Sequence, residues 1–155
     1  MYAISKKSKY GLRALLVLAK RYDQGLVLIA DIAKQERIPR KFLESILLEL
    51  KNTGMLGSKK GKGGGYFLAR PPASISIGEI IRLLDGPMAP VPCVSQRAYH
   101  TCKECREEAT CGIRAVMHDV RDASAAILDR ETLANLLRRE EQLEQQHNKV
   151  LVYAI

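Results

Sequence analysis

The sequence predicts a mainly α-helical fold with a small β-wing, that is, a winged helix-turn-helix followed by a long amphipathic helix. Apolar residues recur at helical spacing along much of the 155-residue chain, and aromatic residues make up only 5% of it. Two short strand-like runs flank a tip rich in glycine and lysine within residues 55–69. Residues 1–72 have 15 Lys and Arg against 5 Asp and Glu, whereas residues 73–155 have 10 against 12. This asymmetry favours a polyanion-binding half joined to a second region.

Three helices are expected in the basic half, residues 1–72. The first covers about residues 7–22 and the second residues 29–35, because apolar side chains recur there at helical spacing. Pro39 suits the first position of a third helix over residues 40–52, which Gly54 is suited to end. Two short helices joined by a tight turn form the outline of a helix-turn-helix. The third helix is expected to bury Phe42, Leu43, Ile46, Leu47 and Leu50.

The start of the third helix carries the predicted base-reading side chains. In a helix-turn-helix, the N-terminal residues of the second helix of the motif meet the base edges. A carboxylate at this place repels phosphate, so Glu44 is tolerated best if it accepts a hydrogen bond from a cytosine amino group. The alternative is a surface glutamate paired with Lys41 or Lys51. The residues expected to face DNA are Arg40, Lys41, Glu44 and Ser45.

The segment at residues 55–69 predicts the wing. Its glycines permit the positive φ angles of a hairpin loop. Lys59, Lys60 and Lys62 are expected to project from this β-ribbon towards phosphates or the minor groove. A phosphate-cradling nucleotide loop is the competing interpretation of KGKGGGY, but the G-x-x-x-x-G-K-[ST] pattern and a following helix are both missing.

Four stretches of the chain resemble one family of bacterial regulators. They are SKKSKYGLRALLVLA, DIAKQERIPRKFLESILLELKNTGML, SKKGKGGGYFLA and ISIGEIIRLLDGPMAPV. The most specific features are FLE in the third helix and GGGY in the wing, with the cysteine block before the long helix in addition. Over about residues 1–137 the sequence is similar to the Rrf-two family, whose members include IscR, NsrR and CymR.

The resemblance implies a homodimeric transcription factor, expected to be a repressor, that binds double-stranded DNA at a pseudo-palindromic operator. In IscR-like members the glutamate of this motif reads bases, and it corresponds to Glu44. Lys60 stands where the family has a wing arginine, which keeps the charge but loses the planar fork of a guanidinium. Lys41 corresponds to a serine of IscR, so the target sequence is expected to differ.

The second half is expected to form a dimerisation region over residues 73–137, with a mobile tail over 138–155. A helix fits residues 77–85, and the prolines of GPMAPVP then exclude a helix. A long amphipathic helix follows, and a short one over residues 132–137. In the resembling family the long helix crosses its partner in the dimer; the alternative is that its apolar stripe packs within its own chain. The stripe consists of Ile113, Val116, Val120, Ala123 and Ile127.

The cysteine loop, residues 93–111, holds all four cysteines of the chain, with the spacing C-x8-C-x2-C-x5-C. The Cys-x-x-Cys pair can place two thiolates on one metal, because a tight turn brings their sulfurs close together. Lys103 and Arg106 flank this pair and are expected to favour the thiolate form. The predicted metal ligands are Cys93, Cys102, Cys105 and Cys111.

An iron–sulfur cluster, either [2Fe–2S] or [4Fe–4S], is the leading interpretation of this loop. In the resembling family, IscR-like and NsrR-like members hold a cluster on three cysteines, which Cys93, Cys105 and Cys111 match. Arg114 stands where IscR-like proteins have a histidine, so Cys102 is the natural fourth ligand. A structural zinc and a thiol switch between Cys102 and Cys105 remain alternatives. CymR-like members lack the cysteines, so a repressor controlled without a cluster, by thiol oxidation, zinc or a partner protein, is the alternative function.

The sequence argues against an enzyme, an electron carrier and a membrane protein. It offers no Ser/His/Asp set, paired carboxylates or nucleotide loop, and no apolar run approaches the roughly 20 residues of a membrane helix. The N-terminus is basic and then apolar, as in a signal peptide, but Arg13 interrupts the apolar run. A cytoplasmic location is therefore expected, and a reducing cytosol argues against a structural disulfide framework.

Overall fold

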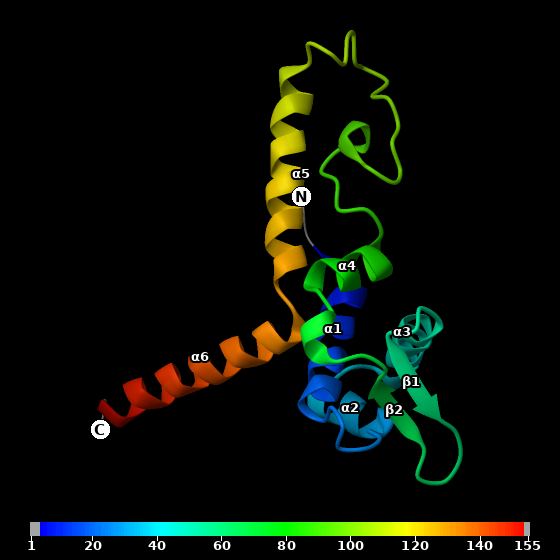
Figure 1. The fold of residues 1–155 in the computed structure, drawn as a ribbon, viewed down its shortest axis with the longest axis vertical. Helices are drawn as coiled ribbons and strands as arrows, with labels where there is room; N and C mark the ends of the chain where they lie inside the picture. The colour runs from blue at the N-terminus through cyan, green and yellow to red at the C-terminus, as the bar shows by residue number, and fades with distance from the viewer. Residues whose placement is uncertain (1–3, 154–155) are drawn as a thin grey trace.

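The computed structural model describes residues 4–153, with side chains described for residues 4–149, and it is mainly helical (Figure 1). Two short 3₁₀ turns, Pro72–Ser74 and Pro92–Val94, lie on either side of the fourth helix. The fold class predicted from the sequence is confirmed. The elements are α1 (Lys6–Lys20), α2 (Ile29–Glu36), α3 (Arg40–Asn52), β1 (Leu56–Lys59), β2 (Gly65–Leu68), α4 (Ile77–Asp85), α5 (Gly112–Arg130) and α6 (Leu133–Tyr153).

Helices α1 to α4 and the hairpin pack around one hydrophobic core, which we call the head. Helix α1 comes close to α4 because Gly11 has no side chain; a Cβ at this position would collide with Leu84. Phe42 departs from the predicted stripe: it is 36% exposed and packs edge-to-face on Tyr10, with ring centroids 5.6 Å apart. The remainder of the predicted α3 stripe is buried, as are Ile77, Ile80, Ile81 and Leu84 of α4.

The wing is an antiparallel hairpin in which Leu56 pairs with Leu68 and Lys59 with Gly65. Its tip turns through Gly61 and Gly63, which adopt φ angles of 92° and 75°. An isolated bridge joins the wing to the segment before α2, because the backbone N–H and C=O groups of Val27 and Tyr66 bond one another at 2.9 Å each way. The base of the wing is thus part of the head, and only its tip projects (Figure 1).

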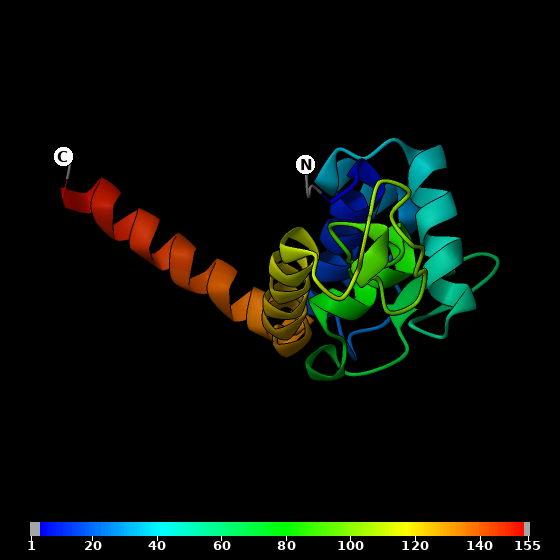
Figure 2. The same ribbon diagram turned by 90° about the horizontal axis from the view of Figure 1, so that it is seen from above.

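The second half of the chain leaves the head in two directions (Figures 1 and 2). Helix α5 stands beside α4 and rises beyond it, and α6 extends away from the foot of α5. An ion pair between Arg82 and Asp129 links α4 to α5, and the Ile77 N–H donates to the Glu131 carbonyl at 2.8 Å. These contacts fix the foot of α5 on the head.

The helices α3 and α4 lie where the sequence predicted them, whereas α6 is longer than predicted. The short helix expected over residues 132–137 is the start of a 21-residue helix that begins at Leu133, so most of the segment 138–155 is helical. Leu133 is fully buried at its start, and Lys20 forms an ion pair of 2.8 Å with Glu140. Beyond this pair, residues 141–149 are exposed. Among the described helices, none combines the length and apolar character needed to cross a membrane.

Asp85, at the end of α4, anchors the start of α1. Its carboxylate accepts hydrogen bonds from the backbone N–H of Ser5, at 2.9 Å, and from the Ser5 hydroxyl. Burial raises the pKa of Asp85, but the two hydrogen bonds from Ser5 and the positive charge of Lys7 outweigh it, so the pKa is lowered from its ordinary value of 3.8.

Asp85→Asn is therefore expected to lower the free energy of unfolding by about 0.5–1 kcal/mol at neutral pH, the range of charge-assisted hydrogen bonds in an exposed place. Because the folded-state pKa is the lower one, this stabilisation is present above pH 3.8 and is lost as the pH falls through the folded value. Urea unfolding of both proteins between about pH 2 and pH 7 measures the difference. Asp23→Asn, an exposed aspartate on the α1–α2 turn, is the control. A difference that stayed constant to the lowest pH would contradict the assignment.

Candidate nucleic-acid interface and cysteine site

The first two turns of α3 present the four residues that the sequence assigned to base reading, and all four are exposed. Glu44 pairs with Arg40 at 3.2 Å, four residues earlier, and not with Lys41 or Lys51 as the surface alternative supposed. The two side chains are 51% and 63% exposed, so the pair is weak and either member can exchange it for a nucleic-acid partner. The Ser45 hydroxyl donates to the Phe42 carbonyl at 2.8 Å.

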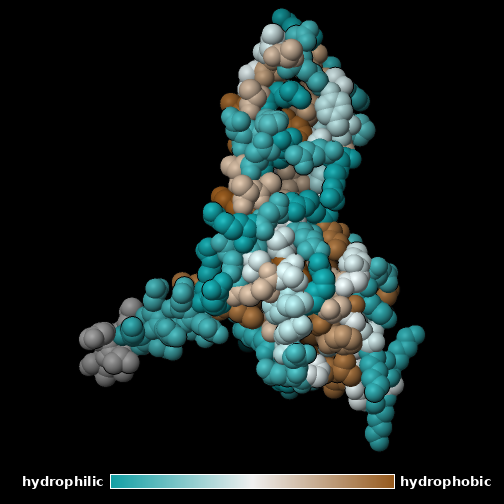
Figure 3. All heavy atoms as spheres, in the orientation of Figure 1, coloured by the Kyte–Doolittle hydropathy of each residue, from teal (hydrophilic) through white to brown (hydrophobic). Residues whose placement is uncertain are grey.

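The wing adds three exposed cations to the same side of the head. Lys59, Lys60 and Lys62 are all exposed, at or beside the glycine-rich tip. The tip forms the hydrophilic arm that projects from the head in Figure 3. Helix α3 and the wing lie on the same side of the head in both ribbon views (Figures 1 and 2). A helix with exposed polar residues beside a basic hairpin is the arrangement that a winged helix presents to a DNA groove and its phosphates.

The cysteine loop lies at the far end of α5 from the head (Figure 1). All four predicted ligands line one cavity of about 480 Å³. Cys93 is buried, Cys105 and Cys111 are half-buried, and Cys102 is exposed; all four are free thiols. The loop is closed by Tyr99, whose hydroxyl bonds the Glu108 carboxylate at 2.7 Å. The structure therefore brings the four cysteines to one site, from the turn after α4 to the start of α5.

A tight turn joins the Cys-x-x-Cys pair, as the spacing predicted: the Cys105 N–H donates to the Cys102 carbonyl at 3.1 Å. The expectation that the flanking cations favour the thiolate form is wrong for Cys105. Burial raises the pKa of the Cys105 thiol, and the neighbouring Cys111 and Cys102 thiols raise it further. Lys103 and Arg106 are exposed and do not offset this, because water screens their charges.

The donor set fits an iron–sulfur cluster in kind and number, since four thiols meet on one cavity. The distances between the thiols do not fit a cluster in this conformation. Within residues 4–149, no three His, Cys, Asp or Glu side chains lie close enough together to hold a metal ion. Between Ser95 and Cys111 the backbone forms turns and bends, with no helix or strand in this span. A segment built in this way can close around a ligand without breaking a hydrogen-bond ladder.

Arg114 is a site residue that sequence reasoning set aside, because a guanidinium cannot ligate a metal. Its side chain lines the cysteine cavity, and its Nε donates to the Cys93 carbonyl at 3.3 Å. Its backbone N–H points at the Cys111 sulfur, 3.4 Å away, because Cys111 caps α5. Arg114 follows the helix-capping Cys111 by three residues, and this spacing could have indicated from the sequence that Arg114 lies at the site. Arg114 thus joins both ends of the loop to α5 and brings a positive charge to the thiols.

The apolar stripe of α5 does not pack within its own chain, so the intrachain alternative is wrong. The exposed fractions are 72% for Ile113, 56% for Val116, 41% for Val120 and 55% for Ile127. Such a row of exposed apolar side chains on one helix marks a protein-binding face. It begins immediately after Cys111, where the cysteine loop ends.

A basic winged helix-turn-helix head joined to a projecting helix defines a DNA-binding regulator. A family model described as Rrf2, an iron-dependent transcriptional regulator, matches residues 4–139. The rrf2-like HTH-type regulator of Rhodobacter capsulatus is 42% identical over 137 residues, which cover 86% of this chain and 91% of that protein. CymR, the global cysteine regulator of B. subtilis, shares 34% identity and a TM-score of 0.73, over 88% of this chain and 96% of that one. T. potens IscR shares 28% identity and a TM-score of 0.70, over 91% and 90%.

The chain belongs to the Rrf2 family of transcriptional regulators. Its relatives are named as regulators and not as enzymes, in agreement with the lack of catalytic motifs in the sequence.

Proposed function

We propose that this protein is a homodimeric transcriptional repressor of the cytoplasm that binds a pseudo-palindromic operator and senses iron–sulfur, redox or nitrosative state through the cysteine loop. The observation that carries the proposal is the cavity lined by Cys93, Cys102, Cys105 and Cys111 at the end of the helix that bears an exposed apolar stripe. The cysteine cavity, which would sense the signal, is therefore adjacent to the apolar face of α5, which would contact the second protomer.

The head supports operator binding through two sets of contacts. Arg40, Lys41, Glu44 and Ser45 face outwards from the start of α3, where they can reach base edges in the major groove. The wing lysines are placed to contact phosphates or the minor groove. In a dimer, two such heads would meet half-sites about one turn of DNA apart, which matches the symmetry of a palindromic operator.

The dependence of operator affinity on salt tests this interface. The slope of log K against log salt is expected to be about −6 or steeper, because each neutralised phosphate contributes roughly −0.9. Lys60→Ala removes one cation from each head and is expected to flatten the slope by about 1.8 for a dimer. Lys149→Ala, an exposed lysine near the far end of α6, is the charge-matched control and should leave the slope unchanged. A nearly flat slope for the unaltered protein would count against DNA as the partner.

The stripe on α5 supports the homodimer. Two copies of this helix crossing through their apolar faces would remove Ile113, Val116, Val120 and Ile127 from water, at roughly 25 cal/mol for each Å² of apolar surface buried. The cysteine loop of each copy would then lie beside the crossing. A change in the order of the loop can in this way alter the separation of the two heads.

Cys93, Cys102, Cys105 and Cys111 are the residues that would hold the cluster, with Cys102 as the fourth ligand. When bound, an iron–sulfur cluster supplies a one-electron redox centre that is sensitive to oxidants and to the supply of iron. The chain's own residues fix the loop: the Cys102–Cys105 turn sets the spacing of one pair, and the bond from Arg114 to the Cys93 carbonyl holds the distant cysteine near α5. Ligation of all four thiols would join the end of α4, the loop and α5 into one unit.

A repressor with no cluster, controlled by thiol oxidation, zinc or a partner protein, is the second candidate. Two observations favour it: the described side chains of residues 4–149 bring no three ligands together, and a structural relative with 34% identity is the cysteine regulator CymR. The thiols of Cys102 and Cys105, at the ends of one turn, are placed for a switch of this kind.

Purification without oxygen distinguishes the two candidates. A brown protein with absorbance at about 400 nm and with iron and sulfide in stoichiometric amounts is expected for the cluster. A colourless protein that contains zinc, or that loses free thiols on oxidation, would establish the second candidate. The apo and loaded proteins should also differ in operator affinity; equal affinities for every operator tested would refute a cluster-controlled switch.

A further inference from the structure

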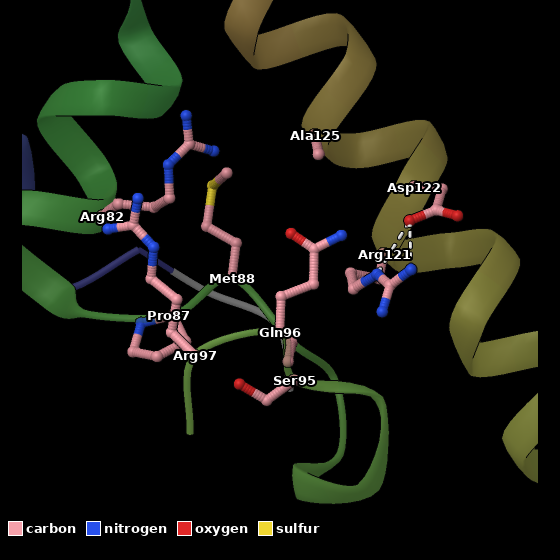
Figure 4. A pocket seen from close by; sticks show the side chains of 10 residues that line it. Arg82, Pro87, Met88, Ser95, Gln96, Arg97, Arg121, Asp122 and Ala125 are labelled. Carbon is pink, nitrogen blue, oxygen red and sulfur yellow. Dashed lines mark hydrogen bonds and ion pairs between the residues drawn. The ribbon is translucent and has the colours of Figure 1, made fainter. Parts of the chain in front are cut away.

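A second cavity, which none of the four cysteines lines, lies between α4, residues 87–97 and α5 (Figure 4). Its volume is about 60 Å³. Sites for drug-sized or nucleotide-sized ligands measure roughly 300–1,000 Å³, so this cavity has room for a small ion, or for the phosphate group of a larger molecule, with some water. Its wall includes three arginines from three different segments: Arg82 from α4, Arg97 from the start of the cysteine loop and Arg121 from α5.

The charges around this cavity do not balance. Arg82 forms an ion pair with Asp129. Arg121 pairs with Asp122 at 2.6 Å, and its Nη1 donates to the Val94 carbonyl at 2.5 Å. Arg97 has no hydrogen bond or ion pair among the described side chains, residues 4–149. Three guanidinium groups against two carboxylates leave one positive charge in excess.

The free guanidinium donors lie on the side of Arg82 and Arg97, because each side-chain nitrogen of Arg121 already has a partner in Asp122, the Val94 carbonyl or His118. In Figure 4 Arg97 and Arg82 lie on one side of the cavity, Arg121 and Asp122 on the other, and Gln96 between them. The Ser95 hydroxyl accepts a hydrogen bond from the Ala98 N–H at 3.0 Å, so its own proton is free to be donated. Met88 and Ala125 supply apolar surface, which lowers the local dielectric and strengthens ionic interactions.

We propose that this cavity binds one small oxyanion, of the sulfate or phosphate class. A guanidinium presents a planar fork of donors that matches the oxygens of such an anion, and Arg97 offers the whole fork. The occupant would neutralise the excess charge. It would also join the head, the cysteine loop and α5, since each arginine belongs to a different one of these parts. The proposal depends neither on a cluster nor on DNA.

Thermal unfolding of the full chain at constant ionic strength tests the site, with sodium chloride replaced stepwise by sodium sulfate or phosphate. A rise in Tm of about 3 °C is expected at concentrations tenfold above Kd, and above Kd it should follow the logarithm of the anion concentration. These anions also stabilise proteins by exclusion from the surface, but that effect rises in proportion to concentration and is common to all variants. Glycerol phosphate forms a third arm: a stronger response than to inorganic phosphate assigns the site to the phosphate of a metabolite, and an equal or weaker one to the free ion.

The decisive comparison is between Arg97→Gln and Arg106→Gln, which remove the same charge from exposed positions inside and outside the cavity. Arg97→Gln is expected to lose the logarithmic rise, Arg106→Gln to keep it, and Arg97→Lys to keep part of it because the charge remains without the fork. The proposal is overturned if Arg97→Gln responds like the unaltered protein, or if Arg106→Gln loses the rise equally. Arg97 is exposed, so its replacement is expected to leave the fold intact.

Discussion

Cys105→Ala protein purified without oxygen is expected to retain less than about one tenth of the iron bound by the unaltered protein, because a cluster lacking one of its thiolate ligands is released. Cys105 is the cysteine most closely associated with the other thiols: Cys111 and Cys102 both act on its pKa, which they raise. Iron and acid-labile sulfide, measured per polypeptide, give the result. Thr101→Ala is the matched control, since Thr101 lines the same cavity without offering a thiol.

Cys102→Ala separates the possible roles of the fourth cysteine. If Cys102 is a ligand, its loss is expected to lower the iron content severalfold. Full retention of iron would show that three cysteines suffice, so that Cys102 could form a disulfide with Cys105 only in protein that has lost the cluster. If the unaltered protein is colourless, the second candidate applies, and the same two variants test it. Each variant should then abolish the loss of operator binding that follows thiol oxidation.

Leu47→Ala is expected to lower the free energy of unfolding by about 2–5 kcal/mol, the cost of leaving a cavity in a packed core. Leu47 is fully buried on the inner face of α3, where it contributes to the core of the head. Leu48, the next residue, is 53% exposed, so Leu48→Ala is a matched control with an expected effect below about 1 kcal/mol. Chemical unfolding of both variants measures the difference. Equal losses would mean that α3 is not packed as described.

The head could be predicted from the sequence because its elements begin and end at residues with strong local preferences. Pro39 and Gly54 bracket α3, and Ser76, whose hydroxyl accepts from the Glu79 N–H at 3.1 Å, starts α4. The glycines of the wing tip adopt the positive φ angles expected of them. Phe42 was misplaced because helical spacing alone cannot show that the adjacent surface, at Tyr10, is only half covered.

The second half was less predictable, because its structure depends on contacts between distant residues and on weaker signals. Leu143 is the one apolar residue of α6 between positions 138 and 149, yet the Glu, Gln, Leu and Lys residues of this stretch favour helix by intrinsic propensity. The convergence of the cysteines followed from their spacing. The positions of Arg114 in the cysteine cavity and of Arg97 in the second cavity did not follow from the sequence. No short-range pattern shows which cations a folded loop brings together.

The bridge between Val27 and Tyr66 has a consequence for how the protein could be switched. It attaches the base of the wing to the segment ahead of α2, which in turn leads through the tight turn to α3. The reading helix and the wing are thereby held at a fixed angle to each other. Signals arriving through α5 would leave the local contacts with each half-site unchanged and alter only whether both heads can dock at once. Regulation would then appear as a loss of cooperativity across the palindrome, with the affinity for a single half-site preserved.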